Sequence, residues 1–136
     1  MGNWILYTIL ALILGIIIYL KVILSKKQET WKKNISIKLL QISKNEKSEN
    51  PLEWKALLVE IDKLLDHTFK ACGIKGETMG ERLKNAKPLF QYSEYQNIWD
   101  AHKTRNKIAH EFNAKISVSE MKISYKILKH SIKQII

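Results

Sequence analysis

The sequence is poor in cysteine and in arginine. Its one cysteine, Cys72, cannot form a disulfide within the chain, and it fits either a reducing compartment or a thiol in a core. Among 23 basic residues only Arg82 and Arg105 are arginines. Because the chain otherwise uses lysine, a contact that needs the planar guanidinium group is to be sought at both positions.

Two common kinds of site are also missing from the sequence. The segment 76–80, Gly-Glu-Thr-Met-Gly, lacks the Lys-Ser/Thr pair of a phosphate-binding loop and has no strand before it. His102 and His110 are eight residues apart, about two helical turns, which is too far for two ligands of one zinc ion without other donors. We therefore expect no metal site and no cofactor.

Positive charge is spread along the whole chain. The net charge is +10, and the count up to residue 50 is 8 basic minus 3 acidic residues, or +5, against 15 − 10 = +5 for the remainder. The excess is therefore not a single basic tail. Both halves are expected to attract anionic surfaces such as phospholipid or nucleic acid.

The longest apolar run lies at the N-terminus, from Trp4 to Leu24, with only Lys21 interrupting it. As a helix it would be roughly 31 Å long, about one hydrocarbon core. A cleaved signal peptide is the alternative, but the run has neither a basic start nor a small-residue cleavage site after it. Because lysines follow the run and no charged side chain precedes it, the sequence predicts a single-pass anchor over 1–24, N-terminus outside and C-terminal domain cytoplasmic.

Residues 25–50 form a basic juxtamembrane segment that ends in a polar linker at 45–50. Trp31, Ile35, Leu39 and Ile42 recur at helical spacing between lysines. A basic amphipathic helix lying on the anionic leaflet and a stalk helix that packs on the following domain fit this pattern equally well. Alternation over 35–39 keeps a short strand open as a third alternative.

Residues 51–136 carry four helix start signals, each followed by apolar residues at helical spacing. They are Asn50 before Pro51, and capping boxes that begin at Thr78, Ser93 and Ser117. The sequence thus predicts helices over about 51–72, 79–87, 94–112 and 118–136, packed as a cytosolic antiparallel four-helix bundle in an all-α protein. So small a bundle has a modest core, which dimerisation would enlarge.

Polar residues that can perform chemistry are concentrated on the third of these helices. The segment from Arg105 through Asn106 to His110 resembles the Arg-(Asn/Asp/His)-x-x-x-His motif of the HEPN superfamily, the higher eukaryotes and prokaryotes nucleotide-binding domains. The resemblance covers about residues 50–136, including the four-helix layout. It implies a metal-independent endoribonuclease, or a catalytically silent relative that binds RNA or nucleotides, with the motifs of two protomers meeting in a cleft.

The residue types suit that implied chemistry. Cleavage of RNA through its own 2′-hydroxyl needs a group that moves a proton near neutral pH, as His110 can do. A guanidinium can hold two oxygens of the charged phosphate, which we assign to Arg105, and the amide of Asn106 can orient either partner. His102 and Lys107 are assigned to substrate binding. Because Arg105 and His110 point roughly 140° apart on an ideal helix, a site shared by two chains is expected.

The charged residues of the motif and of the other predicted helices also have interpretations that involve no chemistry. Arg105 can be a surface ion-pair partner, and His110 an interface or core histidine. Three carboxylates of the first predicted bundle helix are expected on a solvated face: Glu60, Asp62 and Asp66. Of these, Glu60 is expected to pair with Lys63, and Asp66 with Lys70, along the helix. A lysine stripe on the last helix can contact an RNA backbone or simply be solvated: Lys122, Lys126, Lys129 and Lys133.

The combined prediction is a membrane-anchored HEPN-like ribonuclease in a toxin–antitoxin, defence or RNA-processing role. Its expected partners are a second copy of the chain, the lipid bilayer, an RNA substrate and an antitoxin or regulatory protein. Two alternatives remain. One is a non-catalytic module that binds RNA, a nucleotide or a protein at the membrane, and the other is a structural dimerisation domain in which the motif is incidental.

Overall fold

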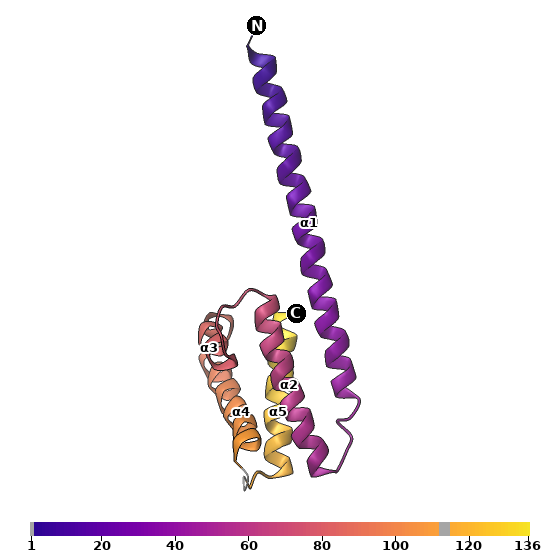
Figure 1. Ribbon diagram of the computed structural model, residues 1–136, viewed down its shortest axis with the longest axis vertical. Coiled ribbons are helices and arrows are strands. Elements are labelled where there is room, and N and C mark those ends of the chain that lie inside the picture. The colour runs from indigo at the N-terminus through magenta and orange to yellow at the C-terminus, as the bar shows by residue number, and fades with distance from the viewer. Residues whose placement is uncertain (1, 112–114) are drawn as a thin grey trace. The chain divides into compact units, whose positions relative to one another are not determined.

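Helices account for all regular structure in the described residues, 2–111 and 115–136, of the computed structural model (Figure 1). They are α1 (Asn3–Ser43), α2 (Pro51–Ala71), α3 (Met79–Asn85), α4 (Tyr92–His110) and α5 (Val118–Ile135), with a 3-10 turn, η1, over Lys87–Leu89. These residues contain no strand. The all-α class is therefore confirmed, and the strand alternative for 35–39 is wrong.

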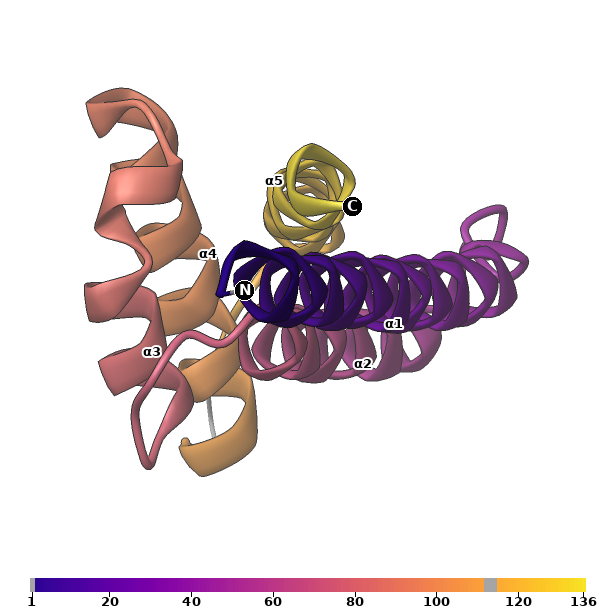
Figure 2. The same cartoon turned by 90° about the horizontal axis from the view of Figure 1, so that it is seen from above.

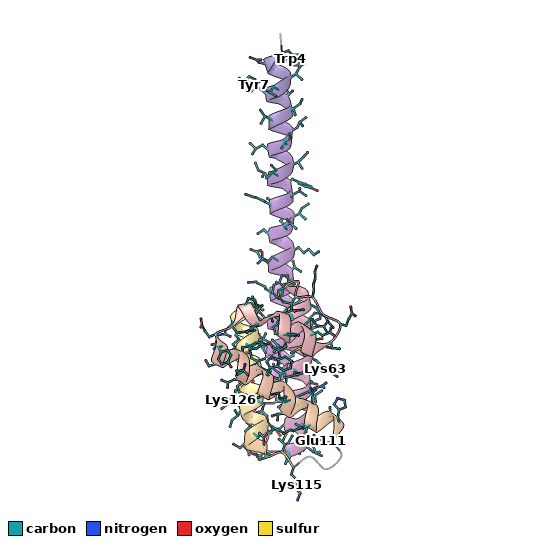
Figure 3. All side chains as sticks on the ribbon, turned by 90° about the vertical axis from the view of Figure 1, so that its left-hand side faces the viewer. Trp4, Tyr7, Lys63, Glu111, Lys115 and Lys126 are labelled. Atoms are coloured by element: carbon teal, nitrogen blue, oxygen red, sulfur yellow. The ribbon has the colours of Figure 1, made fainter. Side chains whose placement is uncertain are left out.

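The chain divides into two compact units, one ending at Asn34 and the other running from Ile35 to Ile136. In the described residues the first unit consists of helix alone, the N-terminal part of α1, and the large apolar side chains between Trp4 and Leu24 are exposed all around it (Figure 3). By length and composition α1 is able to cross a membrane, a property that signal sequences near an N-terminus share.

The last turns of α1 belong to the second unit. Ile35 and Leu39 are only 1% and 5% exposed there, whereas Ile37 and Leu40 on the same helix are 45% and 68% exposed. Residues four apart share one helix face, so a single edge of α1 is packed into this unit. Ile35 and Leu39 are thus part of the core of the second unit.

The helix starts follow short-range signals in the sequence. The side chains of Asn50, Thr78 and Ser117 accept hydrogen bonds from the backbone N–H groups of Leu52, Glu81 and Glu120, at 3.0, 3.2 and 3.1 Å. These satisfy donors that a helix start leaves unpaired, so three predicted caps are confirmed.

The cap predicted at Ser93 is wrong. Gln91 is the N-cap of α4, and its backbone N–H donates to Oε2 of Glu94 at 3.2 Å in a capping box. The helix therefore starts at Tyr92, two residues before the predicted position. The local sequence favours Ser93 because serine is one of the strongly preferred capping residues and glutamine is not.

The core of the second unit lies between α2, α4 and α5, with α3 against α2 (Figures 1 and 2). α2 and α5 share the most extensive contact. The predicted inward faces of α2 and α5 are largely confirmed, although Ile135 and Cys72 are only half-buried. On α4, Tyr95 and Ile98 are buried, Ala109 is exposed, and the predicted apolar residue Phe112 lies outside the described residues.

The linker after α1 is fastened to α5 and α2. The hydroxyl of Tyr125 donates to Oε1 of Glu46 at 2.7 Å, and Lys129 forms an ion pair with the same carboxylate. Nε1 of Trp54 donates to the carbonyl of Ser48 at 2.8 Å. A segment that is polar throughout thereby becomes an ordered connection between helices.

Candidate functional site

A cavity of about 480 Å³ lies beside α4, and three of the five predicted site residues line it. His102, Arg105 and Asn106 contribute one wall. The lining also includes residues from α2, from the start of α3 and from elsewhere on α4: Asp62, Lys63, Asp66, Thr78, Met79, Gly80, Trp99 and Lys103. The cavity thus combines aromatic surface, three cationic side chains and two carboxylates.

The other two predicted site residues lie elsewhere on α4. Lys107 and His110 are exposed, and neither belongs to the described lining of this cavity. His110 is the last residue of the helix. Within one chain, therefore, the described residues do not bring Arg105 and His110 into a common site, as their spacing on the helix had indicated.

Four of the side chains that line the cavity form a closed polar network. Nη1 of Arg105 donates to Oδ1 of Asn106 at 3.0 Å, and Nδ2 of Asn106 lies 3.1 Å from Nε2 of His102. Nδ1 of His102 lies 2.7 Å from Oδ1 of Asp62, whose Oδ2 is 3.4 Å from Nε of Arg105. We call Asp62, His102, Asn106 and Arg105 the polar network.

The network determines the tautomer of the histidine. An amide nitrogen can only donate, so Nε2 of His102 accepts from Asn106, and Nδ1 carries the hydrogen that is donated to Asp62. In this arrangement the Nε2 lone pair of His102 faces Asn106.

The Asp62–His102 pair of the network is buried, Arg105 and Asn106 are half-buried, and the polar groups are almost fully paired. Asp62 is 3% exposed and His102 is 7% exposed. Nε of Arg105 is buried and has no hydrogen-bond partner in the described residues, although it forms the ion pair with Asp62. Burying a carboxylate at this depth requires such partners, since an uncompensated charge would be costly.

Asp62 is a residue that the sequence prediction missed, because it was assigned to a solvated face. That assignment is wrong for Asp62, whereas Glu60 is exposed. A signal was present: Leu58, Asp62, Leu65 and Phe69 recur at the spacing of one helix face, so the aspartate interrupts an apolar stripe. A carboxylate in that stripe predicts a buried partner.

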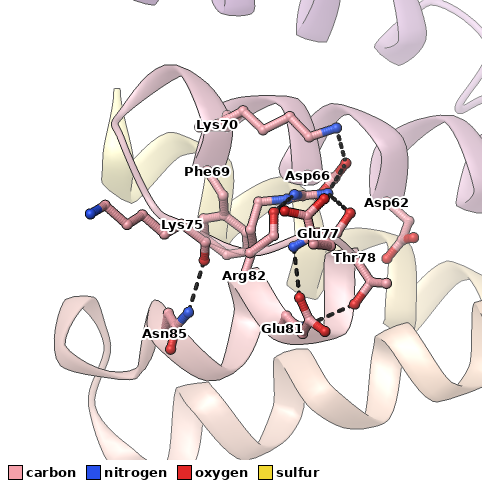
Figure 4. A network of polar contacts seen from close by, with 12 residues as sticks. Asp62, Asp66, Phe69, Lys70, Lys75, Glu77, Thr78, Glu81, Arg82 and Asn85 are labelled. Atoms are coloured by element: carbon pink, nitrogen blue, oxygen red, sulfur yellow. Dashed lines mark hydrogen bonds and ion pairs between the residues drawn. The ribbon is translucent and has the colours of Figure 1, made fainter.

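The second arginine holds the loop that borders the cavity. Arg82, 5% exposed, donates from Nε and Nη2 to the two carboxylate oxygens of Asp66 at 2.5 and 3.1 Å (Figure 4). Its Nη1 and Nη2 also donate to the backbone carbonyls of Gly76 and Glu77. Lysine cannot form this fork, which explains the use of arginine here.

Gly76 permits the close approach of that loop to α3. Its φ is +148°, and a Cβ added to it would lie 2.8 Å from the backbone nitrogen of Arg82. Any other residue at this position would therefore displace the start of α3 or strain the loop. The segment that leads to Thr78 and Gly80 at the cavity is built around this contact.

Two carboxylates outside the polar network have pKa values that are lowered by their hydrogen-bond partners. Burial alone would raise the pKa of Asp66, but hydrogen bonds from Arg82 and Lys70 outweigh burial and lower the pKa below its usual 3.8. Burial likewise opposes the hydrogen bonds from Lys129, Tyr125 and Ser43 to Glu46, and these bonds lower its pKa below 4.5. Both groups are therefore stabilised in the ionised form by the fold.

These shifts predict acid sensitivity. Because both pKa values are lower in the folded state, the stabilisation is present above about pH 4.5 and is lost as the pH falls through the folded pKa values. Urea unfolding followed by circular dichroism should give a constant midpoint from pH 7 to about pH 5 and a lower one by about pH 3. The Asp66→Asn/Glu46→Gln variant should lose part of this dependence, and an unchanged dependence would contradict the assignment.

The predicted lysine stripe on α5 is partly engaged within the unit. Lys129 pairs with Glu46, and Lys122 lies 5.2 Å from the ring centroid of Trp54 and 3.7 Å from a carboxylate oxygen of Glu49. Lys126 and Lys133 are exposed. The stripe is therefore not a uniform row of solvated lysines.

No group of three or more potential metal ligands occurs among the described residues.

Comparisons with known proteins provide no match from which a function could be assigned. No protein-family model matches the chain, and neither a curated protein nor a solved structure matches it. Any statement of function must therefore be argued from the cavity, the polar network and the apolar helix.

Proposed function

We propose that the chain is a membrane-anchored protein whose second unit is an HEPN-like four-helix bundle that binds RNA and cleaves it without a metal. The observation that carries the proposal is that Arg105, Asn106 and His102 line one cavity, with Lys63 and Lys103 beside them. A guanidinium, an imidazole and two ammonium groups suit a phosphodiester whose negative charge grows during cleavage.

The anchor is the N-terminal part of α1. The helix is long and apolar enough to cross a bilayer, and lysines follow the apolar stretch. We propose a single span with the N-terminus outside and the second unit in the cytoplasm, by the positive-inside rule. Anionic lipid headgroups would then lie close to the lysines that follow the span.

Within the site, Arg105 is assigned to stabilising the phosphate in the transition state. His110 of the resembling motif is exposed at the end of α4, so in this proposal it reaches the substrate only from a second copy of the chain. A homodimer is therefore part of the proposal. An antitoxin or regulatory protein that covers the cavity would suit a ribonuclease of a toxin or defence system.

The test is cleavage of a fluorescent single-stranded RNA by the full chain in detergent micelles with excess chelator. Arg105→Ala should lower kcat about 10²–10³-fold, the usual effect of removing one group that stabilises transition-state charge. Lys115→Ala, which removes an exposed lysine, is the matched control and should cleave at the parent rate. If the parent leaves the RNA intact, the enzyme proposal is lost.

The closed polar network favours a second candidate, a module that binds RNA or a nucleotide without turnover. In the network the charge of Arg105 is balanced by Asp62, and Nε2 of His102 is occupied by Asn106. Such a module would bind the RNA saturably, with an affinity that falls as salt is raised, and would release it uncut. Arg105→Ala would weaken that binding.

A further inference from the structure

The polar network contains a carboxylate–histidine pair that lies outside the motif from Arg105 to His110. We propose that His102, oriented by Asp62, is the proton-accepting catalytic residue of the cavity, and that Asp62 is its positioning residue. This inference rests on the proposed RNA cleavage. It differs from the role given to His110, because it places proton transfer within a single chain.

Asp62 orients the imidazole ring of His102. The 2.7 Å contact between Nδ1 of His102 and Oδ1 of Asp62 places the hydrogen on Nδ1 and leaves the lone pair on Nε2. A buried carboxylate in this position holds the imidazole in one tautomer and stabilises the cation that forms when Nε2 takes a proton. Both residues line the cavity, so Nε2 is within reach of a bound substrate once Asn106 moves.

Asn106 covers Nε2 of His102. Asn106 donates to Nε2 and accepts from Nη1 of Arg105, so the amide is held from both sides. A phosphate that binds Arg105 competes with Asn106 for the Nη1 donor, because a charged oxygen is the stronger acceptor. Losing that partner weakens the hold on the amide, which can then rotate and expose Nε2. The base is thus uncovered when substrate is present.

The proposed cleavage needs only His102, Arg105, the RNA and water. Nε2 of His102 takes the proton of an RNA 2′-hydroxyl, the 2′-oxygen forms a bond to phosphorus, and the bond from phosphorus to the 5′-oxygen breaks. The leaving 5′-oxygen takes a proton from water, and the imidazolium returns its proton to solvent. The products are a 2′,3′-cyclic phosphate and a 5′-hydroxyl. Arg105 stays beside the phosphate throughout.

The first experiment measures the tautomer, which does not depend on activity. Nitrogen-15 spectra of the full chain in micelles, labelled at histidine, should show His102 protonated at Nδ1 alone. Asp62→Asn should move part of the population to the Nε2-protonated form, because an amide at position 62 can donate to Nδ1. Asp100→Asn, an exposed aspartate of α4, is the matched control and should leave the spectrum unchanged.

The second experiment measures cleavage of the RNA and of an all-deoxy analogue that lacks the 2′-hydroxyl. His102→Gln should lower kcat about 10²–10⁴-fold, the usual contribution of a general base, with a smaller change in KM. Asp62→Asn should also lower kcat. Its melting temperature, measured in parallel, shows whether the variant is still folded. His130→Gln, which replaces an exposed histidine, should cleave at the parent rate. The deoxy analogue should bind and remain intact.

The outcomes separate the two proposals. If the parent cleaves and His102→Gln cleaves as fast, His102 is not the base and only this inference is overturned. If the parent binds RNA but never cleaves it, both proposals are overturned, and a tautomer fixed by Asp62 then identifies the pair as structural. If His102→Gln does not fold, Asp62→Asn decides the matter through its tautomer and its kcat together.

Discussion

A chain carrying both Ile35→Ala and Leu39→Ala is expected to lose most of the free energy of unfolding of its second unit. The two side chains are 1% and 5% exposed. Replacing a buried Ile or Leu by Ala costs about 2–5 kcal/mol each, from lost apolar burial and the cavity left behind. Since domains of this size are stable by about 5–15 kcal/mol, the double variant should be close to unfolding at 25 °C.

The same helix supplies a matched control. Ile37→Ala with Leu40→Ala removes the same two kinds of side chain from positions that are 45% and 68% exposed. Its effect should stay within about 1 kcal/mol, since exposed substitutions have small effects. Both variants are compared by urea unfolding of a chain that starts at Thr30, followed by circular dichroism. Equal midpoints would show that residues 35–43 do not belong to the folded unit.

Arg82→Met is expected to lower the stability of the second unit by about 3 kcal/mol. The substitution keeps the side chain's bulk but removes five donors, which leaves the carboxylate of Asp66 and the carbonyls of Gly76 and Glu77 short of partners. This loss of stability is at the lower end of the range for breaking a buried ion pair, because Asp66 keeps its ion pair with Lys70 at 3.0 Å.

Two further variants separate charge from geometry at this position. Arg82→Lys keeps the charge but cannot hold both carboxylate oxygens, so an intermediate loss is expected. Lys84→Met, on an exposed part of α3, should change stability by no more than about 0.5 kcal/mol. Thermal melts give the ranking, and protease cleavage between Gly73 and Thr78 should rise in the same order. A melt of Arg82→Met equal to that of the parent would contradict the assigned role.

The helices were predictable to the extent that their signals are local. The caps at Asn50, Thr78 and Ser117 lie within three residues of the groups they satisfy, and the apolar periodicity of α2 and α5 marks the faces that are buried. The continuity of α1 was not predictable in the same way. Lysines interrupt its apolar pattern after residue 20, and a change of surroundings along one helix looks like a boundary between two segments.

The site was predictable only in part, because its partners are distant in the sequence. Asn106 and His102 are four residues apart on one helix, a spacing that puts them on one face, and a hydrogen bond of 3.1 Å joins them. Asp62 lies 40 residues from His102, and no local pattern pairs them. Only the packing of α4 against α2 brings the two together.

The two arginines of the chain have a common dependence on α2. Arg105 on α4 pairs with Asp62, and Arg82 on α3 pairs with Asp66, one turn further along the same helix. A rotation or shift of α2 about its axis would therefore displace the partners of both arginines together. Through Asp62 and Asp66, α2 thus links the α4 wall of the cavity to the loop that leads into α3.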